Sequence, residues 1–216
     1  MTAFDQESLF PVGITQIEDK AFIRRKDLHK LVVPDTVTRI GKEAFSDCTN
    51  LTEVILPESV SRIGSHAFSG CEHLERITAP GLTNLDAGVF ADCSSLASIE
   101  LPHTLASIEQ YDFASCAALR EITFPGRLLF VGAHAFQDCT GLTELDLPDS
   151  IDFVEEYAFE YCTGLKKISL SAHLELDIHA FYKCTNVSEI IVRHGDPLKF
   201  KDYFFGTKWH DANAGA

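Results

Sequence analysis

Apolar residues recur along this chain with a long and regular period. The clearest marker is a phenylalanine that returns at intervals of 22 or 23 residues. Its positions are Phe22, Phe45, Phe68, Phe90, Phe113, Phe136, Phe159 and Phe181. Aliphatic residues keep step with it, six and nine positions after each Phe and five positions before it. Self-similarity at such a period indicates a stack of repeated units.

Cysteine and proline follow the same register. Every cysteine of the chain lies three residues after one of these Phe residues: Cys48, Cys71, Cys93, Cys116, Cys139, Cys162 and Cys184. Proline lies twelve residues after the first six of them, at Pro34, Pro57, Pro80, Pro102, Pro125 and Pro148. Ser171 and Arg193 replace it in the last two units. The unit therefore approximates LxxIxLPxxVxxIGxxAFxxCxx.

The pattern inside one unit predicts its local structure. Residues 51–56 end in an alternation of period two, which is typical of a strand, and Pro57 ends it because proline cannot donate to a ladder. Residues 60–64 form a second, shorter extended piece. Residues 67–74 carry apolar side chains at a spacing of three, which predicts one helical or 3₁₀ turn. A single unit cannot bury its apolar face, but stacked units can, so the pattern predicts a solenoid.

Composition is that of a folded protein that does not bind nucleic acid. The 216 residues are 45% apolar and 23% charged, with no apolar run long enough for a transmembrane helix. The net charge of −14 argues against nucleic acid and anionic membranes as partners, since those are bound through Lys and Arg. The first residues lack a basic and an apolar segment, so no secretory signal is expected in the sequence as written. Either an intracellular protein or one whose signal has been removed would fit.

One family shares this unit. The residues that carry the resemblance in one repeat are Leu51, Val54, Leu56, Pro57, Val60, Ile63, Gly64, Ala67, Phe68 and Cys71. The unit resembles the BspA-type leucine-rich repeat of bacterial and protozoan proteins, over about residues 9–207. The resemblance implies an α/β repeat solenoid that is right-handed and curved. It implies a parallel concave β-sheet, with short helical or 3₁₀ turns and short extended pieces on the convex side. It also implies a cell-surface or secreted protein that binds other proteins and has no enzymatic activity.

Both ends of the chain depart from the repeat. We expect a partial N-terminal repeat or cap over residues 1–13, where Phe10 and Pro11 stand in the place of Leu-Pro. Eight repeats follow over residues 14–192. Residues 193–216 are expected to form a degenerate closing repeat and tail, with Phe204 placed 23 residues after Phe181.

The cysteines could be bridged or reduced. Stacked units lie about 4.8 Å apart, but ladder side chains point in parallel, so their Cβ atoms stay farther apart than the roughly 3.8 Å of a disulfide. Their number is odd, and free cysteine is commonly buried, which favours reduced core thiols. No pair has the short spacing of a zinc site, and none is singled out beside a base. No catalytic motif occurs, so we predict no catalytic residue, metal or cofactor.

Two further features are ambiguous. His66, His134 and His179 share a column with Lys20 and Glu43, which predicts a position at the surface. Asp112 stands in a column that otherwise holds Ala or Val. Either its turn opens to solvate the carboxylate, or it marks a notch that faces a ligand.

A ligand would bind at the variable outward positions of the concave strands. These lie eight and ten residues after each Phe, and their middle is acidic. The predicted ligand-binding residues are Arg76, Thr78, Glu100, Glu121, Thr123, Glu144 and Asp146. The leading hypothesis is a monomeric, non-enzymatic interaction module of a bacterial surface or secreted protein, which binds a protein ligand of unknown identity. A structural or adhesive spacer, whose concave face is merely solvated, is the alternative, and an enzyme is a third, weaker one.

Overall fold

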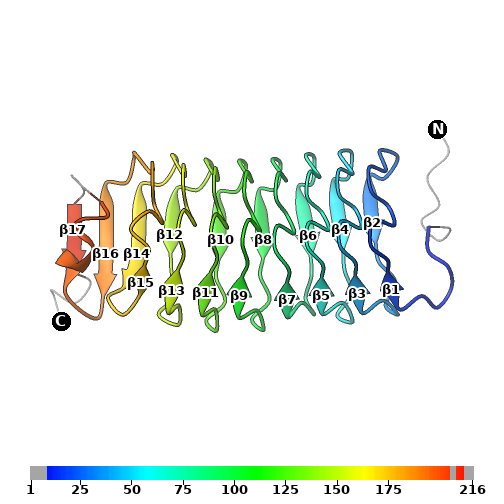
Figure 1. The fold of residues 1–216 in the computed structure, drawn as a ribbon, viewed down its shortest axis with the longest axis horizontal. Helices are drawn as coiled ribbons and strands as arrows, with labels where there is room; N and C mark the ends of the chain where they lie inside the picture. Colours follow the sequence, from blue (N-terminus) through cyan, green and yellow to red (C-terminus); the bar gives the residue numbers. More distant parts are fainter. Residues whose placement is uncertain (1–8, 205–207, 212–216) are drawn as a thin grey trace.

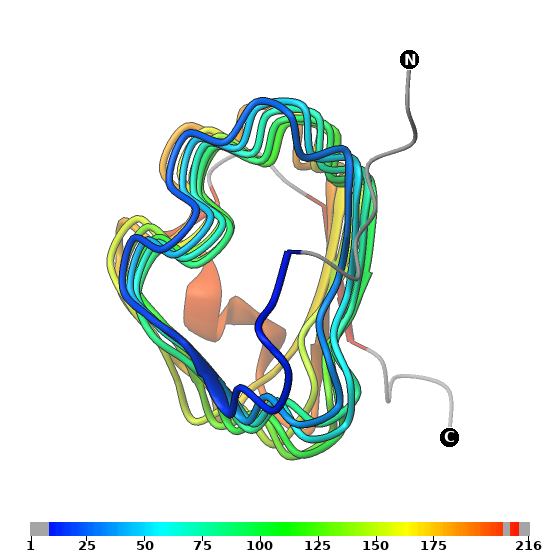
Figure 2. The same ribbon diagram turned by 90° about the vertical axis from the view of Figure 1, so that its right-hand side faces the viewer.

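The chain winds into a stack of coils. The computed structural model describes residues 9–204 and 208–211. The coils follow one another along a single axis, from β1 and β2 at one end of the stack to β17 at the other (Figure 1). Seen along that axis, successive coils lie almost over one another and enclose one continuous core (Figure 2). The predicted leucine-rich repeat solenoid is confirmed.

Most coils contribute two strands, which form two rows in Figure 1. The longer-strand row consists of β2 (Lys30–Val32), β4 (Glu53–Ile55), β6 (Arg76–Thr78), β8 (Ser98–Glu100), β10 (Glu121–Thr123), β12 (Glu144–Asp146), β14 (Lys167–Ser171), β16 (Glu189–Arg193) and β17 (Lys208–Asp211). The shorter-strand row consists of β1 (Gln16–Ile17), β3 (Arg39–Ile40), β5 (Arg62–Ile63), β7 (Asn84–Leu85), β9 (Ser107–Ile108), β11 (Phe130–Val131), β13 (Phe153–Val154) and β15 (Glu175–Leu176).

Every strand pair in the described chain is parallel, and equivalent residues of successive units lie side by side. Leu31 pairs in register with Val54, which pairs with Ile77. Ile40 pairs with Ile63 in the shorter-strand row. The sequence columns are therefore ladders in space, as the repeat predicts.

The expected helical turn around each Phe does not form. Backbone N–H groups there bond alternately within their own coil and to the next coil. Ser46 N donates to Glu43 O at 3.2 Å, whereas Phe45 N donates to Ala67 O of the next coil at 2.8 Å. Left-handed φ values of 53° at Glu43 and 58° at Asp47 break any helix at intervals of four residues. Among the described residues, the one 3₁₀ helix is η2 (Pro197–Phe200) near the C-terminal end.

The phenylalanine column forms a stacked ladder through the core. Phe45 and Phe68 lie nearly parallel, with ring centroids 5.3 Å apart and an interplanar angle of 4°. Both are fully buried. The Phe10 ring packs edge-on against Phe22 at the N-terminal end, and Phe204 extends the ladder beyond Phe181 at 4.9 Å. Both chain ends thus cover the last aromatic layers.

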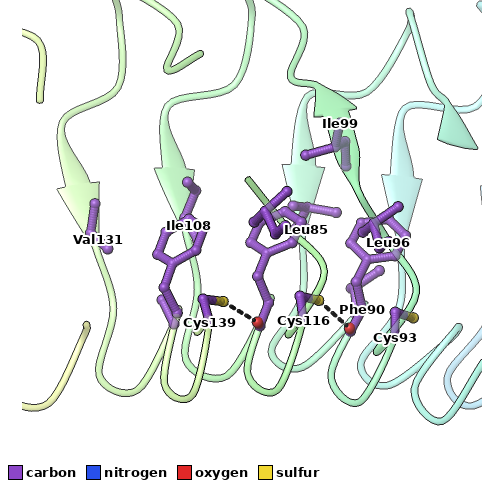
Figure 3. Close-up of a cluster of buried hydrophobic side chains, with 14 of the residues drawn as sticks. Leu85, Phe90, Cys93, Leu96, Ile99, Ile108, Cys116, Val131 and Cys139 are labelled. Atoms are coloured by element: carbon purple, nitrogen blue, oxygen red, sulfur yellow. Dashed lines mark hydrogen bonds between the residues drawn. The ribbon is translucent and has the colours of Figure 1, made fainter. Parts of the chain in front are cut away.

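The cysteine column supports the phenylalanine column through hydrogen bonds. Cys116 Sγ donates to Phe90 O at 3.3 Å, and Cys139 Sγ donates to Phe113 O of the coil before its own at 3.1 Å (Figure 3). The same bond recurs at Cys48, Cys71, Cys93, Cys162 and Cys184. All seven cysteines are free thiols in the structure. Cysteine suits this column because it is small, apolar and still carries a weak donor.

Both strand rows are interrupted beside a shortened unit. Phe90 follows Phe68 after 22 residues, whereas most intervals are 23. The turn after β6 is one residue shorter than its equivalents. A Cβ atom on Gly81 would lie 1.9 Å from Glu58 O, so only glycine fits this close crossing. In the described chain β6 does not pair with β8, nor β7 with β9, and the longer-strand row is interrupted again between β10 and β12.

Asp112 restores hydrogen bonding at this interruption. Its carboxyl group is fully buried and accepts from Val89 N at 3.1 Å and from Glu109 N at 2.7 Å. In other coils the residue equivalent to Glu109 donates to the preceding coil, as Gly132 N does to Ile108 O. Neither sequence interpretation of Asp112 was right, because the carboxyl group is neither solvated nor directed to a ligand. It accepts from Glu109 N in place of a carbonyl of the preceding coil, and from Val89 N in place of a carbonyl within the turn of Val89.

Candidate functional site

The outward side chains of the longer-strand row form a continuous surface, here called the strand face. Along the three-residue strands of this row the middle residue is largely buried and its two neighbours are more exposed, as in the exposed–buried–exposed pattern of β6. All seven predicted ligand-binding residues are exposed: Arg76, Thr78, Glu100, Glu121, Thr123, Glu144 and Asp146. Whether they bind a ligand stays a prediction, but the repeat places them on one face.

The strand face contains two hollows at the points where its ladder is interrupted. Hollow 1 has a volume of about 580 Å³ and lies between β6 and β8. Its lining includes the predicted residues Arg76, Thr78 and Glu100, together with Glu58 and His103 from the following turns. These last two residues were not predicted, because nothing in the repeat pattern indicates that turn positions lie beside the strand face.

The floor of hollow 1 is apolar. Because β6 and β8 do not pair, the hollow reaches between them to Ile77, Ala79 and Leu101 of the core columns. Ala79 is unusually small for its column, which otherwise holds Val33, Leu56, Leu101, Phe124, Leu147, Leu170 and Val192. The small side chain and the open ladder together create the depth of the hollow.

Hollow 2 is more polar and lies two coils farther along. It has a volume of about 570 Å³ and spans β10, β12 and β14. The other four predicted residues line it: Glu121, Thr123, Glu144 and Asp146. The structure thus divides the seven predicted residues between two hollows.

The carboxylate on the N-terminal part of the strand face is held in ion pairs. Glu53 lies between two cations, with Lys30 Nζ at 2.7 Å and Arg76 Nη2 at 3.7 Å. The hydrogen bond from Lys30 lowers the pKa of the Glu53 carboxyl group. Because two cations share one carboxylate, these coils keep one net positive charge and offer no free carboxylate on their outward strand positions.

On the C-terminal part of the strand face, an arginine that was not among the predicted residues pairs with two aspartates. Arg193 Nη1 lies 2.6 Å from Asp146 Oδ1, and Arg193 Nε lies 2.9 Å from Asp149 Oδ1. Its guanidinium group also donates to Ser169 Oγ and Leu147 O. The hydrogen bond from Arg193 lowers the pKa of Asp149. Arg193 replaces the column proline, and this lapse in the pattern was the one available signal.

Three carboxylates remain unpaired between these ion-paired ends. Glu100, Glu121 and Glu144 are exposed and form no ion pair within the described residues. The acidic centre expected from the sequence is therefore smaller by one residue, because Asp146 is paired with Arg193. It extends from the rim of hollow 1 to hollow 2.

A second row of polar and aromatic side chains lies on the turns that contain the Phe column. Tyr111, His134, Tyr157 and His179 stack on one another with centroid separations of 4.9, 5.2 and 5.3 Å. His179 is about half exposed and His134 is mostly covered, so the predicted surface column is partly buried by its own stacking. We call these four residues the turn row.

No feature of the described residues defines a catalytic centre. They contain no group of three His, Cys, Asp or Glu side chains that could hold a metal ion. The buried thiols are poor nucleophiles, because burial raises their pKa, in Cys48 to about 11. Within the same residues, no helix has the length and apolar character needed to cross a membrane.

Comparison with known proteins identifies the family. The profile of the BspA type leucine-rich repeat region matches residues 15–128 and 83–208 with six copies. The chain therefore belongs to this family. The family and its fold are generally non-enzymatic.

Two solved structures show the same architecture. A leucine-rich repeat protein of T. pallidum is 30% identical, covering 85% of this chain and 86% of that one, with a TM-score of 0.71. A leucine-rich repeat protein from Bacteroides ovatus is 26% identical over 87% of this chain, with a TM-score of 0.62. The chain spans 61% of the length of the B. ovatus protein. No curated protein matches the chain.

Proposed function

We propose that this chain is a non-enzymatic interaction module whose strand face binds another protein. The observation that carries the proposal is the row of unpaired carboxylates Glu100, Glu121 and Glu144 beside two hollows on one rigid face. The carboxylates at the ends of the same face are held in ion pairs. Complementary charge steers association, so a basic partner surface is expected.

The repeat architecture supports this use of the face. Each outward position is fixed by buried neighbours in the same strand, so its side chain can vary without loss of the core. The strand face is also long, because it extends over most coils of the stack (Figure 1). A long, preorganised and variable surface suits recognition of a macromolecule better than of a small substrate.

A crosslinking experiment tests the proposal. The intact chain is used to capture partners from the proteins of its natural environment, and the complex is crosslinked and mapped by mass spectrometry. Crosslinks from Lys30 and Lys167, which lie on the strand face, support the proposal. Crosslinks confined to Lys20 and Lys183, near the turn row, would place the interface away from the strand face and contradict the proposal. A face that tolerates charge reversal without loss of capture would favour a structural or adhesive spacer.

We also propose display on a bacterial surface or secretion, on the strength of the family alone. Protease treatment of intact source cells tests this. Digestion of the protein without lysis supports display, and recovery in the culture medium supports secretion. Full protection until the cells are lysed contradicts both.

A further inference from the structure

We propose that hollow 1 receives one apolar side chain of an extended, basic segment of the partner. This inference rests on the proposed function and adds the chemistry of the segment. The volume of about 580 Å³ lies within the usual range for a ligand site, about 300–1,000 Å³. Its floor is apolar and its rim is charged, which is the usual arrangement of an interface anchor site.

The floor of hollow 1 offers more apolar area than the core columns of the coil before it. Ile77 and Ala79 keep 6% and 7% exposure, whereas Val54 and Leu56 of the preceding coil keep 0% and 2%. Leu101, on the other side of the gap, is only partly buried. An inserted side chain would cover these atoms and gain the free energy of apolar burial.

The charges around hollow 1 determine which way the segment runs. Toward the N-terminal end, Lys30 and Arg76 flank Glu53 and leave this network with one net positive charge, which repels a basic segment. Toward the C-terminal end, Glu100, Glu121 and Glu144 have no cation of their own among the described residues. A basic segment anchored in hollow 1 is therefore attracted toward hollow 2.

The spacing of the strands suits an extended chain laid along the stack. Parallel strands lie about 4.8 Å apart, which places the rows of Glu121 and Glu144 about 7 and 12 Å from the middle of hollow 1. In an extended chain every second side chain faces the same way, and two residues span about 6.7 Å. Lysines two and four residues from the anchor therefore reach about 7 and 13 Å, close to the two carboxylate rows.

Two short peptides test the inference directly. They are acetyl-Leu-Thr-Lys-Thr-Lys-amide and its reverse sequence. Two sequences are needed because the bound segment could run from hollow 1 toward hollow 2 in either chain direction. Each is titrated into the ¹⁵N-labelled full chain up to about 10 mM, well above a dissociation constant of about 1 mM that corresponds to weak binding. One of them is expected to give saturable amide shifts at Thr78, Ala79, Leu101 and Glu121. The same peptide with Ala in place of Leu is expected to bind about tenfold more weakly.

The decisive variant is Ala79→Leu, because leucine is the residue most often found in the column of Ala79. The larger side chain fills the floor of hollow 1 and should raise the dissociation constant of the peptide by about tenfold or more. Ala79→Val, with the residue found at Val33, serves if the leucine variant misfolds. Ala106→Leu is the matched control, since Ala106 is exposed on the shorter-strand side, where the next coil carries Leu129. It should leave binding unchanged.

The outcomes separate this inference from the proposed function. If Glu121→Lys with Glu144→Lys abolishes peptide binding but Ala79→Leu does not, the strand face binds and hollow 1 is not the anchor. If peptide shifts cluster at Tyr157 and His179 of the turn row, the anchor in hollow 1 is wrong, and the proposed function is decided separately by the crosslinks of the captured partner. Absence of saturable shifts for both peptides would also overturn the anchor in hollow 1.

Discussion

The carboxyl group of Asp112 accepts a hydrogen bond from Val89 N, one coil earlier, at 3.1 Å. In other coils the equivalent N–H bonds within its own turn, as Ala135 N does to Gly132 O at 3.2 Å. Asp112 also takes the N–H of Glu109. A single buried carboxyl group thus joins two coils where the shortened unit leaves β7 and β9 unpaired.

Replacing Asp112 by Asn should destabilise the stack. Asparagine keeps the size, but its amide NH₂ would face one of the two N–H donors and leave it unsatisfied. Loss of a buried partner typically costs about 1–3 kcal/mol. Chemical denaturation followed by circular dichroism measures this change. An unfolding free energy equal to that of the wild type would mean that the two hydrogen bonds contribute nothing.

The stability of the wild type relative to Asp112→Asn should depend on pH. Burial raises the pKa of Asp112 well above its ordinary value. The folded chain therefore holds a proton that the unfolded chain releases at about pH 3.9. The resulting stabilisation is complete below that pH and is lost as the pH rises through the folded pKa. Denaturation of both proteins from pH 4 to 8 should show their difference shrinking, and a growing difference would contradict the raised pKa.

The fold was predictable because the core repeats, and the exceptions follow from what does not repeat. Phe68 marks a column that recurs in all eight repeats and Cys71 one that recurs in all but the first, so one unit sufficed to predict the ladders. Asp112 and Gly81 occur once each, and their roles depend on a ladder interruption that no local pattern reveals. The helical turn was predicted wrongly because a spacing of three also fits turns with left-handed residues such as His66.

The strand face was predictable in position but not in shape. Alternation identified all seven outward residues, from Arg76 to Asp146. It gave no sign of Arg193 reaching across two coils to Asp146, because that contact joins residues 47 positions apart. Nor could it show hollow 1, which depends on the unpaired edges of β6 and β8.

The seven thiols should be reduced and protected. Each donates to a Phe carbonyl, and burial raises the pKa of Cys71 and Cys116 among others. A thiol reagent at pH 8 should therefore react slowly with the folded chain and titrate about seven groups after unfolding. Cys184, which is only partly buried, should react first. Recovery of fewer free thiols in denaturant would reveal disulfides.

Truncation of the central ladder residue Phe113 should affect cooperativity as well as stability. Its ring is fully buried between Phe90 at 5.5 Å and Phe136 at 5.2 Å. Phe113→Ala should cost about 3–5 kcal/mol and broaden the unfolding transition, because coils couple only to their neighbours. Phe22→Ala, at the partly buried end of the ladder, should cost less. Equal losses at both sites would mean that position along the stack does not matter.

Gly81 should be intolerant of any side chain. The added Cβ atom of Gly81→Ala meets Glu58 O at 1.9 Å, which forces the backbone of two coils apart. Such overpacking typically costs about 1–3 kcal/mol. Gly126→Ala is the control, since its Cβ atom would meet nothing within 4 Å. Thermal unfolding should separate the two variants, and equal melting temperatures would contradict the close crossing.

The most direct test of the proposed function is the association rate of the captured partner at low salt. Glu121→Lys with Glu144→Lys reverses the unpaired acidic centre, while Glu156→Lys with Glu175→Lys makes the same charge change on exposed residues outside the strand face. Lys20→Glu with Glu43→Lys swaps the two residues of an ion pair and leaves the net charge unchanged. In the wild type, Lys20 Nζ lies 3.3 Å from Glu43 Oε2. The strand-face variant should slow association strongly, and high salt should shrink the difference. The other two should bind nearly as the wild type does. If either of them loses binding while the strand-face variant keeps it, the partner binds elsewhere and the proposed site is wrong.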